Sequence, residues 1–337
     1  MSTPELPPLA VTIGDPSGIG PDLILRLYAD RVELGLPPFI VYGNADFLRA
    51  RAQRLGIAVE IADVAPGSAS TAFASALPMA DIAGNVADHP GSPSPLAAPV
   101  VIASIEQAVA DVLHGACRGL VTGPIHKAAL YGAGFAHPGH TEFLAALCSG
   151  SGTPHRAVMM LAHNDLRVVP ATIHVPLSAV PGMITTALIT ETAQILAHDL
   201  RTRFGIAEPR LAVAGLNPHA GEGATIGTED AAVIRPAVEG LKLDGMNIEG
   251  PIPADALFHV PRWRSYDAVI TMYHDQGLIP IKTVAFDEAV NITLGLPLVR
   301  TSPDHGTALD LAGTGQGSPA SFLAALRMAD RLTGRPA

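Results

Sequence analysis

The sequence predicts an α/β fold divided into two lobes. Short apolar runs alternate with segments of helical periodicity, which is the pattern of a parallel, doubly wound sheet. The chain has 337 residues, 48% of them hydrophobic, and this exceeds what one core usually sustains, so we expect two lobes. Polar clusters follow several apolar runs directly, and open α/β sheets bind ligands at the carboxyl ends of their strands.

The elements of the N-terminal third alternate regularly. We expect strands at Leu9–Ile13, Phe39–Tyr42 and Ile57–Ile61, and helices over Asp22–Asp30 and from Asn44 through Arg54. Pro21 supports the start of the first helix, because proline fits a first helical turn. Residues 62–99 are rich in Ala, Pro, Gly and Ser, which predicts surface excursions with one short strand.

The same alternation continues to the C-terminal end. Helical periodicity predicts helices over Ala98–Leu113, Thr185–Phe204 and Ser318–Thr333. Buried strands are predicted at Leu120–Thr122, Val158–Leu161, Val168–His174, Leu211–Gly215 and Ala268–Ile270.

Composition narrows the classes of function. The net charge is −10, from 21 basic and 31 acidic residues, and no Lys/Arg-rich run is present, which makes nucleic acid an unfavourable partner. No apolar run reaches about 18 residues, and the first residues lack the pattern of a signal peptide, so we expect a cytoplasmic protein. Cys117 and Cys148 are isolated, which predicts free core thiols.

A glycine cluster follows the first strand. Gly14, Gly18 and Gly20 form neither the dinucleotide pattern GxGxxG nor a Walker A loop. Such a tight strand-to-helix turn lets a ligand approach the backbone closely, although a purely structural turn accounts for the glycines equally well.

Three histidines follow predicted strands and suggest a metal site. His174, in ATIHVPL, is the last residue of a predicted strand. His219 follows a strand in AGLNPHAGEG, and His274 follows one in VITMYHDQG. Neutral imidazole is a common ligand of Zn²⁺, and three protein ligands with an open fourth position mark a catalytic metal. Asp255 and Asp275 are candidates for further oxygen ligands or for partners of the histidines. The competing interpretation is hydrogen-bonded loop histidines, with the two aspartates as helix caps or solvated carboxylates.

Other polar residues suit an anionic ligand. His140 and Thr141 lie where a helix is predicted to begin, and Thr141 is a candidate to cap it and to bind an anion through backbone N–H groups. Lys282, Asn291 and Arg300 add positive charge and a neutral donor, which suits a phosphorylated or carboxylated substrate. Taken singly, Lys282 and Arg300 also fit solvated surface charges.

Over nearly its whole length the chain resembles the 4-hydroxythreonine-4-phosphate dehydrogenase family. The resemblance is carried by long, ordered segments: GDPSGIGPD, VTGPIHKAAL, PGHTEFLA, HVPLSAV, LNPHAGEGATIGTED, GPIPADALF, MYHDQGLIPIK and VNITLGLPLVRTSPDHGTALDLAGTG. The superfamily is similar to isocitrate and isopropylmalate dehydrogenases. The segments GDPSGIGPD and HGTALDLAG of this chain resemble glycine-rich segments of those enzymes. Departures are small, with Asp22 where many relatives have Glu and Ser17 where many have Ala.

The resemblance implies a set of site residues. It places the divalent metal (Zn²⁺, Mg²⁺ or Co²⁺) on His174, His219 and His274, contributed by both chains of a homodimer. It places substrate contacts on His140, Thr141, Lys282, Asn291 and Arg300, and candidates for proton transfer on Lys282, Asp255 and Asp275. NAD or NADP would lie against Gly14, Asp15, His305, Gly306, Thr307, Asp310 and Gly313, with its adenosine side on the HGTALDLAGTG loop.

The resemblance also implies an architecture and a reaction. The architecture is isopropylmalate dehydrogenase-like, with parallel or mixed sheets flanked by helices and an active site in the cleft between the lobes. The cofactor lobe would comprise 1–125 and 290–337, and the metal, substrate and dimerisation lobe 126–289. The implied reaction is the oxidation of 4-phosphooxy-L-threonine to 2-amino-3-oxo-4-(phosphooxy)butanoate, which decarboxylates to 3-amino-2-oxopropyl phosphate in vitamin B6 biosynthesis.

Other functions remain open from the sequence. A paralogous dehydrogenase would act on D-threonate or D-erythronate 4-phosphate, or on a cyclic diol carboxylate. Outside the dehydrogenases, histidine clusters at strand ends also activate water in metal-dependent hydrolases. A ligand-binding or acyl-transfer protein on the same sheet would have no redox role, since a fold alone does not decide function.

Overall fold

The computed structural model describes residues 6–150, 152 and 154–334, and the chain divides into two compact units. Unit 1 comprises the described residues up to Ala157 and from Leu296 onward, and unit 2 is Val158–Gly295. The segment 126–157, which the sequence assigns to the second lobe, belongs to unit 1. The reason is that Phe143 and Leu144 are buried in the same hydrophobic core as the strands of unit 1. The ends of the predicted cofactor lobe, 1–5 and 335–337, lie outside the described residues.

Unit 1 is built on a parallel sheet. Its strand order is β3-β4-β2-β1-β5-β12. The strands are β1 (Leu9–Thr12), β2 (Phe39–Gly43), β3 (Ile61–Asp63), β4 (Leu77–Asp81), β5 (Leu120–Thr122) and β12 (Arg300–Pro303). Every residue of β1, β2 and β5 is buried, as expected for parallel strands that are covered on both faces.

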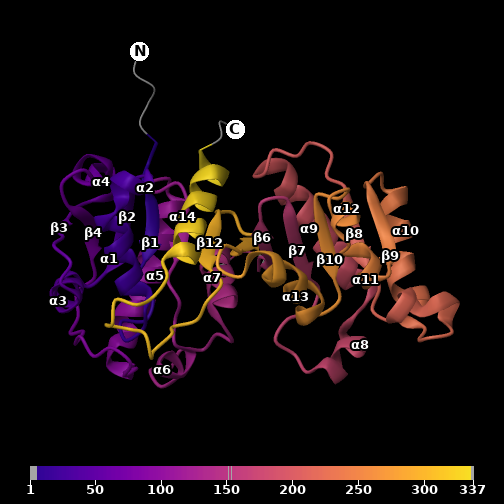
Figure 1. The fold of residues 1–337 in the computed structure, drawn as a ribbon, viewed down its shortest axis with the longest axis horizontal. Helices are drawn as coiled ribbons and strands as arrows, with labels where there is room; N and C mark the ends of the chain where they lie inside the picture. The colour runs from indigo at the N-terminus through magenta and orange to yellow at the C-terminus, as the bar shows by residue number, and fades with distance from the viewer. Residues whose placement is uncertain (1–5, 151, 153, 335–337) are drawn as a thin grey trace, which may run out of the picture. The chain divides into compact units, whose positions relative to one another are not determined.

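Helices cover the sheet of unit 1. They are α1 (Gly20–Ala29), α2 (Arg31–Leu34), α3 (Ala45–Leu55), α4 (Pro66–Ala72), α5 (Ala98–Leu113), α6 (Lys127–Tyr131), α7 (His140–Ser149) and α14 (Ala320–Thr333), with the 3₁₀ turn η1 (Pro95–Ala97). The C-terminal α14, in yellow, lies against β12 in Figure 1. Among the described residues, Pro95–Leu113 is the one helical stretch long and apolar enough to cross a membrane, yet the buried face of α5 packs into the core of unit 1.

Unit 2 is built on a mixed sheet. Its strand order is β11-β6-β7-β10-β8-β9, antiparallel from β11 through β7 and parallel from β7 through β9. The strands are β6 (Val158–His163), β7 (Leu166–Pro170), β8 (Leu211–Ala214), β9 (Ile248–Ile252), β10 (Ala268–Thr271) and β11 (Val290–Leu294). The neighbours β7, β10 and β8 therefore end at the same edge of the sheet.

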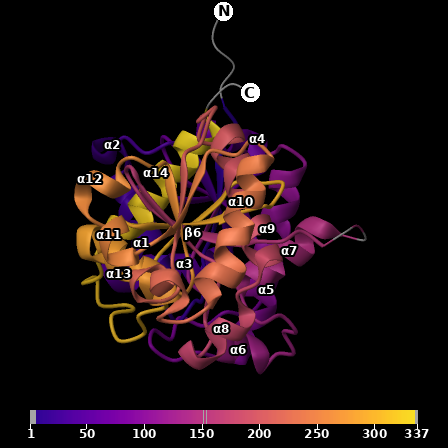
Figure 2. The same ribbon diagram turned by 90° about the vertical axis from the view of Figure 1, so that its right-hand side faces the viewer.

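Helices lie on both faces of this second sheet. They are α8 (Val180–Met183), α9 (Thr186–Thr202), α10 (Arg235–Leu243), α11 (Ala254–Leu257), α12 (Val260–Trp263) and α13 (His274–Ala285), with the 3₁₀ turns η2 (Leu177–Ala179) and η3 (Pro218–Ala224) and the π turn η4 (Asp230–Ile234). In Figure 2, α9 and α10 lie on one side of the strands and α11, α12 and α13 on the other.

The predicted fold class is confirmed, while several strand bounds differ from those predicted. The third strand begins at Ile61, four residues later than predicted, because its register with β4 begins at the pair Ile61 and Leu77. Residues 57–60 alternate between half-buried and exposed positions. The strand before His174 ends at Pro170, so His174 lies on the loop beyond the strand and not at its last position. The predicted helix over Ala98–Leu113 has the same bounds in the structure.

Candidate functional site

The three predicted metal ligands follow neighbouring parallel strands of unit 2. His174 lies beyond the end of β7, His274 is the first residue of α13 after β10, and His219 lies in η3 after β8. Because β10 pairs with β7 on one side and β8 on the other, all three loops leave the same edge of the sheet. This is the edge at which α/β sheets bind ligands.

Two of these histidines lie close together. The ring centroids of His174 and His274 are 5.8 Å apart. Both rings line a hollow of about 280 Å³, together with Thr172, Tyr273 and the apolar residues Val175, Leu177 and Val180. The Nδ1 of His274 lies 2.7 Å from the Oδ1 of Asp275, a pairing that orients an imidazole and leaves its Nε2 for a ligand. A pair of imidazoles held in this way fits a divalent metal ion.

His219 lies on a loop with an unusual backbone. The residues 219–224 all have positive φ, from 42° to 77°, and only two of the six are glycines. His174 also has a positive φ of 52°. Left-handed backbone costs about 1–2 kcal/mol for a residue with a Cβ, and such strain concentrates at functional sites. Among the described residues, no group of three or more His, Cys, Asp and Glu forms a metal-binding cluster, so His219 does not join the other two histidines.

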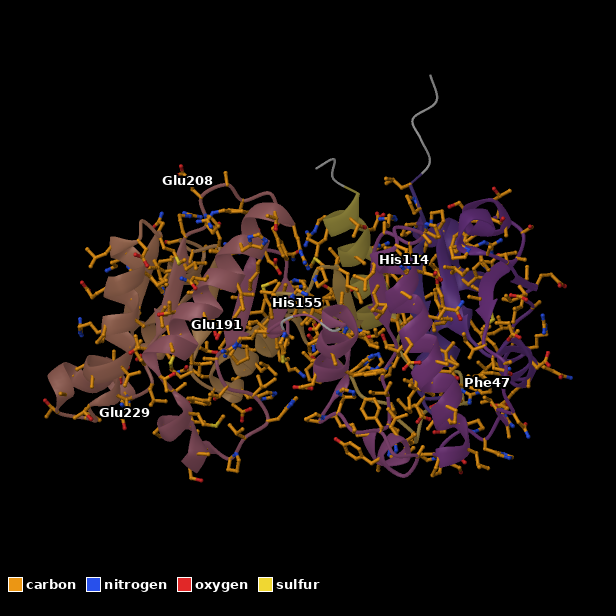
Figure 3. The ribbon with its side chains drawn as sticks, turned by 180° about the vertical axis from the view of Figure 1, so that it is seen from behind. Phe47, His114, His155, Glu191, Glu208 and Glu229 are labelled. Carbon is orange, nitrogen blue, oxygen red and sulfur yellow. The ribbon has the colours of Figure 1, made fainter. Side chains whose placement is uncertain are left out.

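A buried carboxylate fixes the start of the His219 loop. Asp230 accepts hydrogen bonds from the backbone N–H of Leu216 (2.8 Å) and of Asn217 (3.1 Å), and from the Asn217 amide (2.9 Å). The Asn217 amide also donates to Glu229, labelled in Figure 3, at 2.9 Å. The pKa of the Glu229 carboxyl is lowered by hydrogen bonds from its own backbone and from Asn217. These contacts oppose relaxation of the strained segment.

Gln276 joins two of the ligand-bearing loops. Its Nε2 donates to the carbonyl of Gly215 at 2.7 Å, and its Oε1 accepts from the N–H of Met272 at 2.7 Å. A side chain on Gly215 would collide with Ala220 and with Asp230, so the loop after β8 packs closely on itself and on Asp230. These two hydrogen bonds hold the ends of β8 and β10 side by side. They thereby fix the starting points of the loops that carry His219 and His274.

The predicted catalytic groups of unit 2 occupy different places. Lys282 lies on α13 and lines a second hollow that also includes His274 and Asp275. Asp255 is exposed in the first turn of α11 and lines neither hollow. Asn291 is half-buried on β11. Lys282 therefore shares a hollow with His274 and Asp275, while Asp255 lies outside both hollows.

The predicted anion-binding residues of unit 1 begin a helix. α7 starts at His140, with Gly139 as its N-cap, so the predicted helix start is confirmed. The predicted capping role of Thr141 is wrong, because Thr141 lies inside the helix and no side chain caps this end among the described residues. The first N–H groups of a helix remain available to an anion in that situation.

A buried cation lies close to His140. Arg300 is 4% exposed and donates to the Thr122 hydroxyl from Nε (3.1 Å) and Nη2 (2.6 Å). Burial lowers the pKa of Arg300 to about 10. Burial, and then the charge of Arg300, lower the pKa of His140 well below its ordinary value. The Nε2 of His140 is enclosed, with no hydrogen-bond partner among the described residues. A phosphate group would give the Nε2 of His140 a partner and would pair with the charge of Arg300.

The first glycine loop of unit 1 lies where the order of its strands reverses. From β1 the chain continues to β2 on one side and later to β5 on the other, so the crevice of the sheet opens between β1 and β5. A Cβ on Gly14 would lie 2.5 Å from the Pro124 carbonyl oxygen, which shows how closely the two loops pack. Asp15 is buried and accepts from the backbone N–H of Ser17 at 2.8 Å.

The second predicted cofactor loop adjoins the first. The N–H of Ile19 donates to the carbonyl of Thr307 at 2.8 Å. The Nε2 of His305 is enclosed without a partner among the described residues, while Gly306 borders open space. Asp310 is exposed, and Gly313 has a φ of 73°. An enclosed polar atom beside an open backbone fits a ligand with hydrogen-bonding groups, such as a dinucleotide.

Several residues that shape these loops carry no signal in the sequence. Long-range contacts give four of them their role, with partners 14 to 61 positions away: Arg51, Asp88, Gln276 and Asp230. Gln276 is part of the polar cluster after a strand, so its neighbourhood could be found from the sequence, although its partner could not. Arg51 lies in an ordinary helical segment, and nothing in that segment marks it.

Comparison with known proteins assigns the chain to a family. The family model described as "Pyridoxal phosphate biosynthetic protein PdxA" matches residues 36–329. The chain is 52% identical over 326 residues to 4-hydroxythreonine-4-phosphate dehydrogenase of Xanthobacter autotrophicus, covering 96% of this chain and 93% of that protein. Among solved structures, it is similar to 4-hydroxythreonine-4-phosphate dehydrogenase of Klebsiella pneumoniae, with 35% identity and a TM-score of 0.86 over 97% and 99% of the two chains. It is also similar to a terephthalate 1,2-cis-dihydrodiol dehydrogenase of Burkholderia xenovorans, with 29% identity and a TM-score of 0.65 over 98% of each chain.

Proposed function

The chain belongs to the family of pyridoxal phosphate biosynthetic proteins PdxA, and on that premise we propose that it is a 4-hydroxythreonine-4-phosphate dehydrogenase. It would oxidise 4-phosphooxy-L-threonine with NAD or NADP and a divalent metal ion. The observation that carries the proposal is the 52% identity to a protein of that name over nearly the whole of both chains. The arrangement of His174 and His274 supports a metal-dependent reaction.

The metal would be held by His174, His219 and His274. The chemistry of the donor set fits Zn²⁺ or Co²⁺, which imidazole suits, and availability in the cell would decide among them and Mg²⁺. A bound divalent ion would lower the pKa of the substrate hydroxyl and stabilise the negative charge that develops as its proton leaves. The pairing of His274 with Asp275 would hold that imidazole in the tautomer a ligand needs.

The phosphate would be bound by His140, Thr141 and Arg300. Arg300 supplies a buried positive charge, and His140, neutral at pH 7 because its pKa is lowered, donates or accepts through an enclosed Nε2. The first N–H groups of α7 would add donors at Thr141. Fixing the phosphate at one end sets the position of the reacting carbon at the other, which is how remote contacts accelerate a reaction.

Lys282 is the stronger candidate for the proton acceptor. It lines the hollow that contains His274 and Asp275, whereas the alternative base, Asp255, lies outside it. The hydroxyl proton would pass to Lys282 or to a water that Lys282 holds, and the hydride to the nicotinamide ring of the cofactor. The resulting β-keto acid, 2-amino-3-oxo-4-(phosphooxy)butanoate, would lose CO₂ to give 3-amino-2-oxopropyl phosphate. Asn291 would orient the substrate through its amide.

The cofactor would lie against the two glycine-bearing loops of unit 1. Gly14 and Asp15 begin one loop, and residues 305–313 form the other. The enclosed Nε2 of His305 and the open backbone at Gly306 support contacts with the dinucleotide. This site needs no GxGxxG motif, because the strand order rather than the motif creates the crevice.

A homodimer with shared active sites is part of the proposal. One chain brings His174 and His274 together, and His219 is separate from that pair among the described residues. This arrangement is compatible with a metal site to which both subunits contribute. The enzyme would act in the cytoplasm on a small phosphorylated substrate.

The test is NAD reduction with 4-phosphooxy-L-threonine, D-threonate 4-phosphate and D-erythronate 4-phosphate, each with and without a chelator. We expect rapid, chelator-sensitive reduction with the first substrate alone. Preference for a sugar-acid phosphate would retain the metal and the fold but assign the chain to a paralogous activity. Turnover of any of these compounds without NAD or NADP would contradict a dehydrogenase.

The second candidate is oxidation of a cyclic diol carboxylate. The similarity to a terephthalate dihydrodiol dehydrogenase structure favours it, at a lower TM-score than the first assignment. Such a substrate carries no phosphate, so the enclosed His140 beside the buried Arg300 favours the phosphorylated substrate.

A further inference from the structure

A single buried arginine connects the loops of unit 1. Arg51 is 0% exposed and donates from all three nitrogens of its guanidinium. Nη2 donates to the Pro16 carbonyl at 2.6 Å and Nη1 to the Gly18 carbonyl at 3.2 Å, both in the first glycine loop. Nε donates to the carboxylate of Asp88 at 2.7 Å. Nη1 also pairs with the carboxylate of Asp22.

Asp22 transmits this contact to the second loop. Its other carboxylate oxygen, Oδ2, accepts from the backbone N–H of Gly313 at 2.6 Å. The carboxylate of Asp22 therefore bridges the Arg51 guanidinium and the HGTALDLAGTG loop. The N–H of Ile19 and the carbonyl of Thr307 form a second, direct link between the same two loops at 2.8 Å.

Asp88 brings in a third segment. The backbone N–H of Gly91, three residues after Asp88, donates to the Ser17 carbonyl at 2.8 Å. The segment around Asp88 therefore also contacts the first loop. Burial would raise the pKa of Asp88, but the hydrogen bonds from Arg54 and Arg51 outweigh it and lower the pKa. The charges of two arginines and two aspartates balance, which is the condition for keeping ions buried.

We propose that Arg51 is a positioning residue for the nicotinamide cofactor. It fixes the first glycine loop relative to the HGTALDLAGTG loop before the cofactor arrives. This inference rests on the proposed function, since that function places NAD on these two loops. Arg51 contacts the loops through backbone carbonyls and through Asp22, so it acts on the cofactor through other groups and not by touching it. Preorganised loops lose less conformational entropy on binding, and this raises affinity.

The chain contains a matched control for Arg51. Arg54 lies on the same helix and pairs with the same carboxylate, at 2.6 Å from Oδ2 of Asp88, but its side chain is 46% exposed. Its aliphatic stem packs beside Gly313, and among the described residues its guanidinium donates no hydrogen bond to either glycine loop. Arg51→Lys keeps the buried charge while losing the planar fork, because a lysine ammonium cannot reach four acceptors at once. Arg54→Lys makes the same chemical change at the exposed end of the network, and it keeps the aliphatic stem that packs beside Gly313.

The experiment measures NADH binding by fluorescence titration and the two KM values of the folded variants. We expect Arg51→Lys to weaken NADH binding and to raise the KM for NAD by about tenfold, with the KM for 4-phosphooxy-L-threonine within about twofold. Arg54→Lys should stay within about twofold of the parent in all three quantities. Equal increases in both KM values for Arg51→Lys, or unchanged NADH affinity, would overturn the proposal.

A measurement on the unmodified protein covers the case in which Arg51→Lys does not fold. Hydrogen exchange of the cofactor-free protein should show the Gly313 amide already protected, because Asp22 holds it. Exchange at the rate of an open loop until NADH is added would overturn the proposal. Failure of the parent protein to bind NADH would instead contradict the proposed function, and the exchange rate would still decide whether the second loop is fixed before the cofactor arrives.

Discussion

The two units hold their ligand-binding loops in different ways. In unit 1 the left-handed positions of these loops are mostly glycines, including Gly14 and Gly313, with Ala308 as the exception. A buried network centred on Arg51 holds them together. In unit 2 the loops contain left-handed residues that have side chains, among them His174 and His219. Hydrogen bonds to Asp230 and Gln276 hold these loops.

The difference follows from what each loop is proposed to present. A loop that receives a dinucleotide along its backbone can use glycine, which adopts positive φ without a steric cost. A loop that presents an imidazole cannot use glycine at that position, so the strain stays in the backbone and must be offset by nearby contacts. The loops of unit 1 are thus suited to binding a dinucleotide through backbone groups. The loops of unit 2 are suited to binding a metal ion through imidazole side chains.

The largest expected effect is loss of turnover when a histidine of unit 2 is removed. His174→Ala, His219→Ala and His274→Ala should each reduce kcat/KM by about 10³-fold or more, since a catalytic metal supplies several kcal/mol. The fold should persist, as followed by circular dichroism. His198→Ala, at an exposed position on α9, is the control and should retain full activity. Full turnover of His219→Ala with added metal would contradict the ligand set.

Arg300→Met should raise the KM for the phosphorylated substrate by about 100-fold, because hydrogen bonds to charged groups contribute about 1.5–3 kcal/mol. The measurement compares 4-phosphooxy-L-threonine with its dephosphorylated form in initial-rate assays. If Arg300 binds the phosphate, the variant and its parent should handle the dephosphorylated compound equally. An equal loss with both compounds would place Arg300 elsewhere in the mechanism.

Asp230→Ala should destabilise the fold by about 2–3 kcal/mol, since it leaves the half-buried N–H groups of Leu216 and Asn217 without this acceptor. Loss of a partner that orients a metal ligand typically lowers metal affinity by about 10–100-fold. Urea unfolding and metal titration measure the two effects. Glu229→Gln keeps an acceptor for Asn217 and should change both values little. Unchanged metal affinity in Asp230→Ala would separate the His219 loop from the metal site.

His140→Gln should flatten the acid limb of the stability profile. The native pKa of His140 lies well below 6.5, so as pH falls below about 6.5 the unfolded chain takes up a proton that the native protein does not. The parent therefore loses up to about 1.4 kcal/mol per pH unit more than the variant in that window. Urea unfolding at a series of pH values measures the slopes. His114→Gln, at the exposed end of α5 (Figure 3), is the control. Equal slopes for the parent and His140→Gln would contradict a buried, neutral His140.

The smallest effect concerns backbone strain. Ala220 has a φ of 51°, so Ala220→Gly should relieve about 1–2 kcal/mol of strain while adding about 0.4–1 kcal/mol of unfolded-state entropy. The net prediction is a gain of about 0.5 kcal/mol in unfolding free energy, measured by urea denaturation. A loss above about 1 kcal/mol would show that the left-handed run is not strained at this position.

Much of the fold follows from local patterns in the sequence. Buried apolar runs predict β1 and β10, and helical periodicity predicts α5 with its observed bounds. The placement of the three histidines after strands is predictable for the same reason. α13 is not predicted, because Gly277 and Pro280 lie within it and both disfavour helix interiors.

The parts of the site that depend on distant contacts are not predictable in this way. The left-handed run from His219 contains ordinary residue types, and the hydrogen bonds that Leu216 and Asn217, just before it, donate to Asp230 indicate why it persists. Arg51 contacts residues 29 to 37 positions away, and its role depends on the sheet bringing those segments together. Local propensity carries no information about such partners.

Equilibrium dialysis with Co²⁺, combined with NADH titration of the same samples, tests the division between the units most directly. His274→Ala should lose Co²⁺ binding and keep the NADH affinity of the parent protein. Arg51→Lys should keep the Co²⁺ affinity of the parent protein and bind NADH more weakly. Retention of Co²⁺ by His274→Ala, or loss of NADH binding together with the metal, would contradict the assignment of metal binding to unit 2 and cofactor binding to unit 1.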